Sequence, residues 1–234
     1  MSVYSSATPN KIIQQPTKTL TSKPPLVEPS STSISQTPSP TEGLENPKST
    51  LGDPTWTDDL SDPSSWYQDD DEYTTIDSNN GFLRLTSLQS IGWHGWSMHY
   101  HTLDDSYIEA DIKINNCNGS DRYGLAFRSP DYIQGYFFGV TCDGKYMLNK
   151  YDGVKFHNII ASNQSDTIKS GSGQNNILGI LTEGTNISLY INDILLTSIN
   201  DSSYSQGTFG VFIAAFATPG FNIELDTIRY WLFN

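Results

Sequence analysis

From Trp56 onward the chain is a series of short apolar stretches, many of them alternating with polar residues, and Gly, Asn, Asp and Ser separate them. None of these stretches shows the apolar period of about 3.6 residues that marks an amphipathic helix. Strands are predicted at residues 81–87, 107–114, 123–128, 136–142, 145–151, 176–182, 186–191, 194–199, 207–216 and 221–233. Because about a dozen strands at regular spacing without intervening helices are typical of a sandwich, we expect an all-β, antiparallel two-sheet fold.

Three dipeptides between these segments are typical of hairpin turns: Asp143-Gly144, Asp152-Gly153 and Asn192-Asp193. Gly, Asn and Asp adopt a positive φ at low cost, which such turns require. The sequence therefore predicts that neighbouring strands are joined by tight turns and run antiparallel.

Alternation predicts which side chains of residues 107–114 face the core. One face carries Ile108, Ala110, Ile112 and Ile114, and the other carries Tyr107, Glu109, Asp111 and Lys113. Successive side chains of a strand point to opposite faces, so the apolar set is expected to pack between the sheets. In residues 123–128, Gly124, Ala126 and Arg128 form a narrow face that we expect to open onto a groove.

The first 50 residues contain 10 Ser, 8 Thr and 8 Pro, and no apolar period runs through them. This composition predicts a disordered Ser/Thr/Pro-rich linker over residues 1–55, followed by one folded domain over residues 56–234. The net charge is −13, and the Lys and Arg residues form no cluster. Nucleic acid is therefore excluded as a partner, and no stretch reaches the roughly 18 apolar residues of a membrane span.

Two cysteines are placed at the ends of predicted strands. Cys117 follows one strand and Cys142 ends another. We expect a disulfide between them, with two reduced structural thiols as the alternative. Residues 1–10 show neither a signal peptide nor an anchor. A Ser/Thr/Pro stalk joined to a disulfide-bonded domain nevertheless favours an extracytoplasmic protein, secreted or tethered to the cell surface, over a cytosolic protein with a disordered N-terminus.

The order of these segments resembles the concanavalin A-like lectin/glucanase superfamily, in the form of the jelly-roll modules attached to bacterial lipoproteins, surface proteins and sensor kinases. The resemblance covers about residues 56–234, and its most specific pieces are DRYGLAFR, the aromatic strand ending in CDGKY, and LYIND. It implies a laminin G-like or laminarinase-like sandwich of two curved sheets. In that superfamily the concave sheet often carries the binding or catalytic groove.

The same resemblance argues against hydrolysis. Laminarinase-like glycoside hydrolases carry a Glu-x-Asp-x-Glu motif on one strand, whereas this chain has Glu109, Asp111 and then Lys113. Without the second glutamate no pair of carboxylates is available for retaining hydrolysis, and a lysine is a poor proton donor at neutral pH. We therefore expect no enzymatic activity. The simplest alternative is that the three charges decorate the polar face of a strand.

Two tryptophans are the best candidates for contacts with a sugar. Trp93 and Trp96 are flanked by glycines in a polar stretch, and a flat ring can cover the C–H groups of a sugar. In the leading hypothesis they stack on a glycan, Glu109, Asp111 and Arg128 bind its hydroxyls, and Lys113 adjusts the charge. Either tryptophan could equally belong to the core.

A structural calcium ion is the cofactor that the sequence favours. Modules of this kind often bring their chain ends together, and some of them bind calcium there, so Asp59 and Asp226 are the expected ligands. His94, His99 and His101 could instead hold a transition metal, although a polar edge strand explains them more simply.

Carbohydrate recognition without catalysis is the function that these observations favour, with a glycan or cell-surface polysaccharide as the partner. A protein-binding adhesion, assembly or sensor domain is the first alternative, and it predicts a broad exposed apolar patch. A glycoside hydrolase is the second, and it needs another acid from a different strand.

Overall fold

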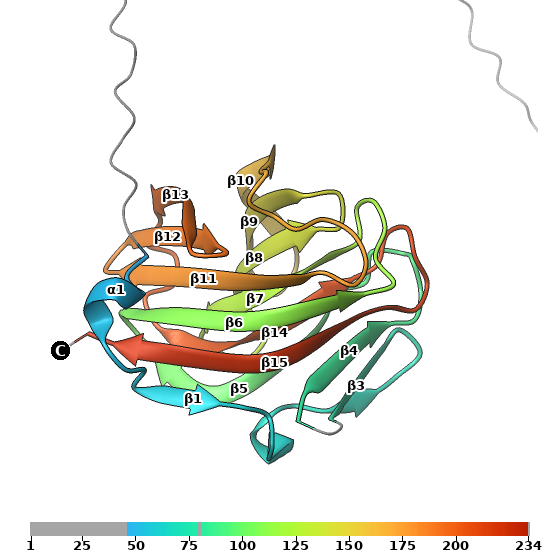
Figure 1. Cartoon of the computed structure of the whole chain (residues 1–234), viewed down its shortest axis with the longest axis horizontal. Coiled ribbons are helices and arrows are strands. Elements are labelled where there is room, and N and C mark those ends of the chain that lie inside the picture. The colour runs from blue at the N-terminus through green and yellow to red at the C-terminus, as the bar shows by residue number, and fades with distance from the viewer. Residues whose placement is uncertain (1–45, 79–80, 234) are drawn as a thin grey trace, which may run out of the picture. The chain divides into compact units, whose positions relative to one another are not determined.

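The computed structural model describes residues 46–78 and 81–233, which form a sandwich of two antiparallel sheets (Figure 1). Residues 1–45 of the linker predicted over residues 1–55 lie outside the described residues. The two short helical turns are α1 (Lys48–Leu51) and a 3-10 turn (Pro63–Ser65). The expected all-β, two-sheet architecture is confirmed.

One sheet has nine strands in the order β13-β12-β11-β6-β15-β4-β3-β2, with β1 also paired to β15. Their bounds are β1 (Trp56–Asp58), β2 (Asp69–Asp70), β3 (Thr74–Ser78), β4 (Leu83–Ser87), β6 (Ser106–Asn115), β11 (Asn175–Glu183), β12 (Asn186–Ile191), β13 (Ile194–Asn200) and β15 (Phe221–Leu232). The first and last strands of the domain thus lie side by side, as expected.

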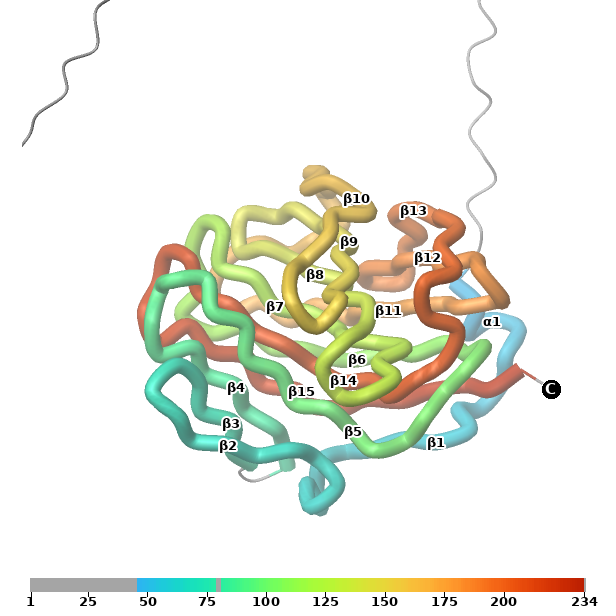
Figure 2. The backbone as a smooth tube through the Cα atoms, turned by 180° about the vertical axis from the view of Figure 1, so that it is seen from behind, coloured from blue at the N-terminus to red at the C-terminus, as the bar shows by residue number. Residues whose placement is uncertain are grey.

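The other sheet has six strands in the order β10-β9-β8-β7-β14-β5, and Figure 2 views it from its own side. Their bounds are β5 (Gly95–Leu103), β7 (Arg122–Ser129), β8 (Gly135–Thr141), β9 (Lys145–Tyr151), β10 (Phe156–Gln164) and β14 (Gly207–Ala214). Sequence reasoning gave no bounds for β1, β2, β3, β5 or β10, which are short or lack clean alternation.

The core lies between the two sheets and follows the predicted alternation. Ile108, Ala110, Ile112 and Ile114 of β6 are buried in it, together with Tyr123, Leu125 and Phe127 of β7. The predicted turns also form, and both Asn192 and Asp193 have a positive φ, as the turn between β12 and β13 requires.

A second, smaller apolar cluster covers the outer face of the six-stranded sheet. It contains Met98, Ala126, Phe137 and Phe212, and Trp96, Tyr151 and Phe156 pack against it. Phe212 is paired across the strands with Trp96 on one side and Gly124 on the other. The outer face of this sheet is therefore aromatic and largely filled by its own side chains.

Residues 46–55, which we call the N-terminal strap, pack against the outer face of the nine-stranded sheet. Lys48 Nζ lies 2.7 Å from Glu109 Oε2, Leu51 packs against an aromatic cluster that includes Trp231, and the Trp231 indole donates to the carbonyl of Gly52 at 2.9 Å. The linker predicted over residues 1–55 therefore does not extend through these last ten residues, because they have apolar and ionic partners on the sheet.

The expected disulfide joins Cys117 to Cys142, with a Cα–Cα distance of 5.6 Å. It ties the loop after β6 to the end of β8. Neither cysteine is free, which agrees with an oxidising compartment. Within the described part of the chain, no helix has the length and apolar character needed to cross a membrane.

Replacing both cysteines by serine should lower the free energy of unfolding by about 3 to 4 kcal/mol, because the bridge closes a loop of 25 residues in the unfolded chain. Denaturant unfolding of the double variant measures this loss, and the wild type in reductant is the matched control. A double variant as stable as the oxidised wild type would contradict a structural role for the bridge.

Candidate functional site

The six predicted ligand residues do not share one groove. Glu109, Asp111 and Lys113 lie on β6 and point outward from the nine-stranded sheet, since their neighbours along the strand fill the core. Trp96 lies on β5 and packs on the outer face of the six-stranded sheet. The prediction of a single groove is therefore wrong, because alternation defines two faces within a strand but not the sheet to which the strand belongs.

Glu109 is a structural anion. Its side chain is 1% exposed, and its carboxylate lies between Lys48 Nζ at 2.7 Å and Arg229 Nε at 3.4 Å. The Tyr107 hydroxyl also donates to it at 3.3 Å. A buried carboxylate with two cationic partners is stabilised within the protein and has no surface left for a ligand.

Asp111 and Lys113 are accessible, but they too have partners on the nine-stranded sheet. The Asn175 amide donates to Asp111, and Lys113 Nζ lies 2.9 Å from Glu224, which Arg84 also binds at 2.6 Å. Burial alone would raise the pKa of Glu224, yet the hydrogen bonds from Lys113 and Arg84 hold it below its usual value. This outer face is therefore a network of ion pairs.

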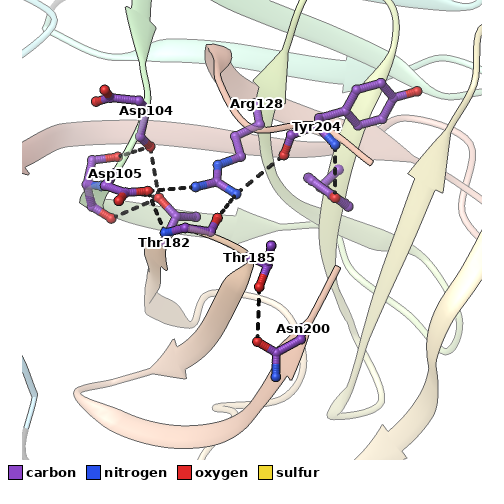
Figure 3. A network of polar contacts seen from close by, with 10 residues as sticks. Asp104, Asp105, Arg128, Thr182, Thr185, Asn200 and Tyr204 are labelled. Carbon is purple, nitrogen blue, oxygen red and sulfur yellow. Dashed lines mark hydrogen bonds and ion pairs between the residues drawn. The ribbon is translucent and has the colours of Figure 1, made fainter. Parts of the chain in front are cut away.

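Arg128 is buried at the end of β7, where it joins three segments of the chain (Figure 3). Its guanidinium donates to Asp105 Oδ1 at 3.0 Å, to the carbonyl of Gly184 at 2.9 Å and to the carbonyl of Tyr204 at 3.3 Å. It is 3% exposed and cannot bind the hydroxyls of a ligand. The prediction that Arg128 contacts a ligand is therefore wrong, and its role is structural.

Trp93 and Trp96 line a pocket of about 460 Å³ at the edge of the six-stranded sheet, where β5 faces β2 and β3. We call it the aromatic pocket. Its rings are Tyr67, Trp93, Trp96, Tyr100 and Tyr132. Trp93, Tyr100, Tyr132 and Tyr67 are each about half exposed, at 47% to 59%. The two tryptophans that the sequence singled out are thus brought together in a cavity open to solvent.

Local structure holds these rings in place. The Trp96 indole donates to the carbonyl of Tyr132 at 3.0 Å, which ties β5 to the loop between β7 and β8. The Trp93 ring stacks on Tyr73, with ring centroids 4.7 Å apart. Gly95 leaves room for the side chain of Thr74, with which any Cβ at this position would collide. Packing against Thr74 therefore requires a glycine at position 95, next to Trp96.

Polar groups enter the aromatic pocket from the segment before β3. Asp69 and Asp71 line it with exposed carboxylates, and the Tyr67 hydroxyl donates to Asp69 at 2.8 Å. This hydrogen bond raises the pKa of Tyr67, so the phenol stays protonated. The Thr74 hydroxyl, in a residue 4% exposed, also lines the pocket and has no hydrogen-bond partner among the described residues. The pocket thus offers convergent acceptors beside flat apolar surfaces.

Sequence reasoning missed Tyr67 and Asp69 as parts of this site. The signal that could have found Tyr67 is the alternation with Trp66, which is buried and forms a bridge to His99 on β5. That bridge places the next side chain, Tyr67, on the outer side, where it lines the same pocket as Trp96.

His94 adds a neutral ring to the pocket wall. Burial, together with the positive charge of Arg122 nearby, lowers the pKa of His94 to about 4. Its ring packs on Phe156 with centroids 4.5 Å apart. At neutral pH the lining of the aromatic pocket therefore contains carboxylates and no cation.

The metal predictions have no further support. No group of three or more His, Cys, Asp and Glu side chains that could hold a metal is found in residues 46–78 and 81–233. Asp226 is exposed on β15, and Asp59 accepts a hydrogen bond from the backbone of Ser61 at 3.1 Å. His99 is buried among core aromatic rings. A calcium ion at Asp59 and Asp226 stays a prediction.

No protein-family model and no curated protein matches the sequence. Solved structures do match, among them a carbohydrate-binding module (CBM66) from Bacillus subtilis at 20% identity and a TM-score of 0.58, covering 72% of this chain and 96% of that one. The calcium- and Man3GlcNAc-bound exoplasmic/lumenal domain of VIP36 matches at 11% identity and 0.54, covering 75% and 86%. A β-glucanase from Bacillus licheniformis matches at 13% and 0.52, covering 76% and 98%. At these identities the likeness shows the fold.

The depressed pKa of His94 predicts a loss of stability in acid. The unfolded chain takes up a proton near pH 6.5 and the folded chain near 4, so this contribution is complete above 6.5 and is lost as the pH falls toward 4. The loss should be on the order of 3 kcal/mol. An NMR titration of the His94 ring, with unfolding measured at each pH, checks both statements. A His94 midpoint near 6.5 would show that the ring is solvated.

Proposed function

We propose that this chain, which has the concanavalin A-like jelly-roll fold, is a carbohydrate-binding module whose ligand lies in the aromatic pocket and is not hydrolysed there. The observation that supports it most directly is the group of half-exposed rings beside exposed carboxylates, with Trp93, Tyr132 and Asp69 as representative members. A sugar needs both features, because its C–H faces are apolar and its hydroxyls need hydrogen bonds.

The size of the pocket supports the same proposal. Its volume of about 460 Å³ falls within the range of roughly 300 to 1,000 Å³ that is usual for small-ligand sites. The solved structures of similar fold include proteins described as a carbohydrate-binding module and as a glycan-bound domain. Their ligands are their own, and they make a glycan the first class to test here.

The absence of hydrolysis is part of the proposal, and residues 109–113 support it. Lys113 stands where the second catalytic acid would be needed, and Glu109 is buried between Lys48 and Arg229. A retaining mechanism needs two accessible carboxyl groups about 5 Å apart on either side of the scissile bond. The outer face of β6 offers no such pair.

We also propose that the chain works outside the cytoplasm, because the bridge between Cys117 and Cys142 persists in oxidising compartments. A structural calcium at Asp59 and Asp226 belongs to the same proposal. Hard oxygen ligands of this kind suit calcium, and backbone carbonyls and water can complete its coordination.

A protein partner is the second candidate function, and exposed apolar side chains favour it. Ile91, Ile133 and Phe216 are 63%, 50% and 39% exposed, and the first two lie close in sequence to Trp93 and Tyr132 of the pocket. An adhesion, assembly or sensor domain could use such a surface.

A glycan array probed with the full chain tests the first proposal, once with calcium and once with a chelator. Selective, saturable binding of a glycan class is the expected result, and its loss on chelation would support the calcium ion. An array that stays blank under both conditions would overturn the carbohydrate proposal and favour a protein partner.

Replacing Trp93 or Tyr132 by Ala should weaken binding of the selected glycan by at least about tenfold, because each variant removes a stacking surface. Both side chains are half exposed, so the fold should survive, and Tyr132→Ala keeps the backbone carbonyl that binds the Trp96 indole. Isothermal titration calorimetry measures the affinity.

Asp111→Asn is the matched control for these variants, because Asp111 is a partly exposed polar residue on the opposite sheet. It should bind as the wild type does. If Asp111→Asn abolishes binding while Trp93→Ala has no effect, the ligand lies on the nine-stranded sheet and the aromatic pocket is not the site.

A further inference from the structure

One arginine of this chain differs from the other three. Three of the four arginines form ion pairs with carboxylates: Arg84 with Glu224 at 2.6 Å, Arg128 with Asp105 at 3.0 Å and Arg229 with Glu109 at 3.4 Å. Within the described ranges, Arg122 has neither an ion pair nor a side-chain hydrogen bond, although the chain is strongly acidic. Its guanidinium instead lies over the ring of Phe216, 4.4 Å from the centroid.

Arg122 lines a second cavity, which we call the polar pocket. Its volume is about 220 Å³, and it lies over β7 to β10 on the outer face of the six-stranded sheet. Besides the charged Arg122, Asp143 and Lys145, the side chains that supply hydrogen-bonding groups here are Ser120, Thr141, Asn149, Asn158 and Ser162. This composition is unlike that of the aromatic pocket, because amides, hydroxyls and one free cation replace the exposed rings.

The charge of Arg122 is not balanced within the polar pocket. Lys145, the other cation in the lining, lies 2.5 Å from Asp143 Oδ2, and these two charges offset one another. The polar pocket therefore has a net charge of +1, which comes from Arg122, although the whole chain has a net charge of −13. Burial lowers the pKa of Arg122, but an arginine stays protonated at neutral pH. A half-buried cation without an anionic partner is unfavourable, and an anion from outside can supply the missing interaction.

The two pockets are neighbours on the same face. Ala126 belongs to the outer apolar cluster on which Trp96 packs. Arg122 lies four residues before Ala126 on β7, and alternate residues of a strand share a face, so Arg122 and Trp96 lie on the same face of the sheet. Phe216 connects them more closely, since its ring lies under Arg122 and 6.2 Å from the ring of His94, which lines the aromatic pocket. One extended ligand can therefore reach both pockets across Phe216.

We infer that the polar pocket is a second subsite, which binds an oxyanion carried by the glycan through the guanidinium of Arg122, so that the ligand is an acidic glycan. The inference rests on the proposed function. The planar guanidinium can form two parallel hydrogen bonds with a carboxylate or a sulfate group. The surrounding asparagines and hydroxyls can bind the sugar hydroxyls beside it.

The size and the rim of the polar pocket agree with this role. A volume of about 220 Å³ is below the usual range for a complete small ligand, so it suits one substituted ring of a longer chain. Thr141 and Asp143 of the lining flank Cys142, and Ser120 follows the loop that begins at Cys117. The disulfide therefore fixes both sides of the rim.

Arg122→Gln tests the inference on the glycan array and by calorimetry. The wild type should prefer uronic acid or sulfated glycans to neutral ones, and Arg122→Gln should weaken binding of the acidic glycans at least about tenfold. Arg122→Lys keeps the charge but not the paired donors, so it should recover only part of the affinity. Arg84→Gln removes an equal charge from the opposite sheet and should have no effect.

A second measurement does not depend on the array. The Nε–Hε signal of Arg122 is followed by NMR while sodium D-glucuronate, D-glucose 6-sulfate or neutral D-glucose is added. Movement with an acidic sugar but not with glucose supports the subsite, and the sugar that acts distinguishes a carboxylate from a sulfate. No movement with either acidic sugar overturns the inference.

Failure of the acidic-glycan inference can be distinguished from failure of the carbohydrate proposal. Acidic glycans bound no better than neutral ones by the wild type, and equally well by Arg122→Gln, would overturn the acidic ligand and leave carbohydrate binding standing. A blank array would overturn carbohydrate binding itself, and movement of the Arg122 signal would then still support an anion site on this face. Thermal unfolding of each variant establishes that the fold is intact.

Discussion

No side chain fits at Gly124, and the outer face of the six-stranded sheet depends on that constraint. A Cβ there would collide with the carbonyl oxygen of Phe138 and press on the ring of Phe212. Gly124 pairs with Phe212 on β14 and with Gly139 on β8, so two neighbouring positions lack side chains. The Phe212 ring fills part of this space and supports Trp96 and His94 beyond it. The aromatic pocket therefore begins at one edge of this filled region, and the polar pocket lies over β7 to β10 on the other side of Phe216.

Much of the fold follows from local rules. Alternation in residues 107–114 and 123–128 predicts which side chains fill the core, turn chemistry predicts the hairpins, and two cysteines at strand ends predict the disulfide. Alternation and turn chemistry are properties of one strand or one turn, so nearby sequence determines them. The assignment of strands to sheets is not local, because β6 takes its neighbours β11 and β15 from far along the chain. For that reason the sequence did not reveal that Glu109 and Trp96 lie on different sheets, on opposite sides of the sandwich.

The candidate site shows the same division. Trp93 and Trp96 were identified because glycines and polar residues surround them, and both line the aromatic pocket. Glu109 and Arg128 were expected to meet a ligand, but each has protein partners that the sequence does not reveal. The partners of Glu109 come from the N-terminal strap and from β15, and the partners of Arg128 come from three separate loops. A charged residue on a polar face is thus ambiguous until its distant neighbours are known, and the unpaired Arg122 stands out only by that comparison.

The N-terminal strap has a mechanical consequence. It is fastened to the outer face of the nine-stranded sheet, whereas both pockets lie on the side of the six-stranded sheet. When a ligand is held fixed and the chain is pulled at residue 46, the tension first meets the hydrogen bond of Asn46 with Asp193 and the ion pairs of Lys48 with Glu109 and Asp193. It then meets the hydrogen bond of Trp231 with Gly52, and after that the pairing of β1 with β15. These contacts join residues that line neither pocket. The N-terminal strap can therefore detach from the sheet under force while both pockets keep their structure.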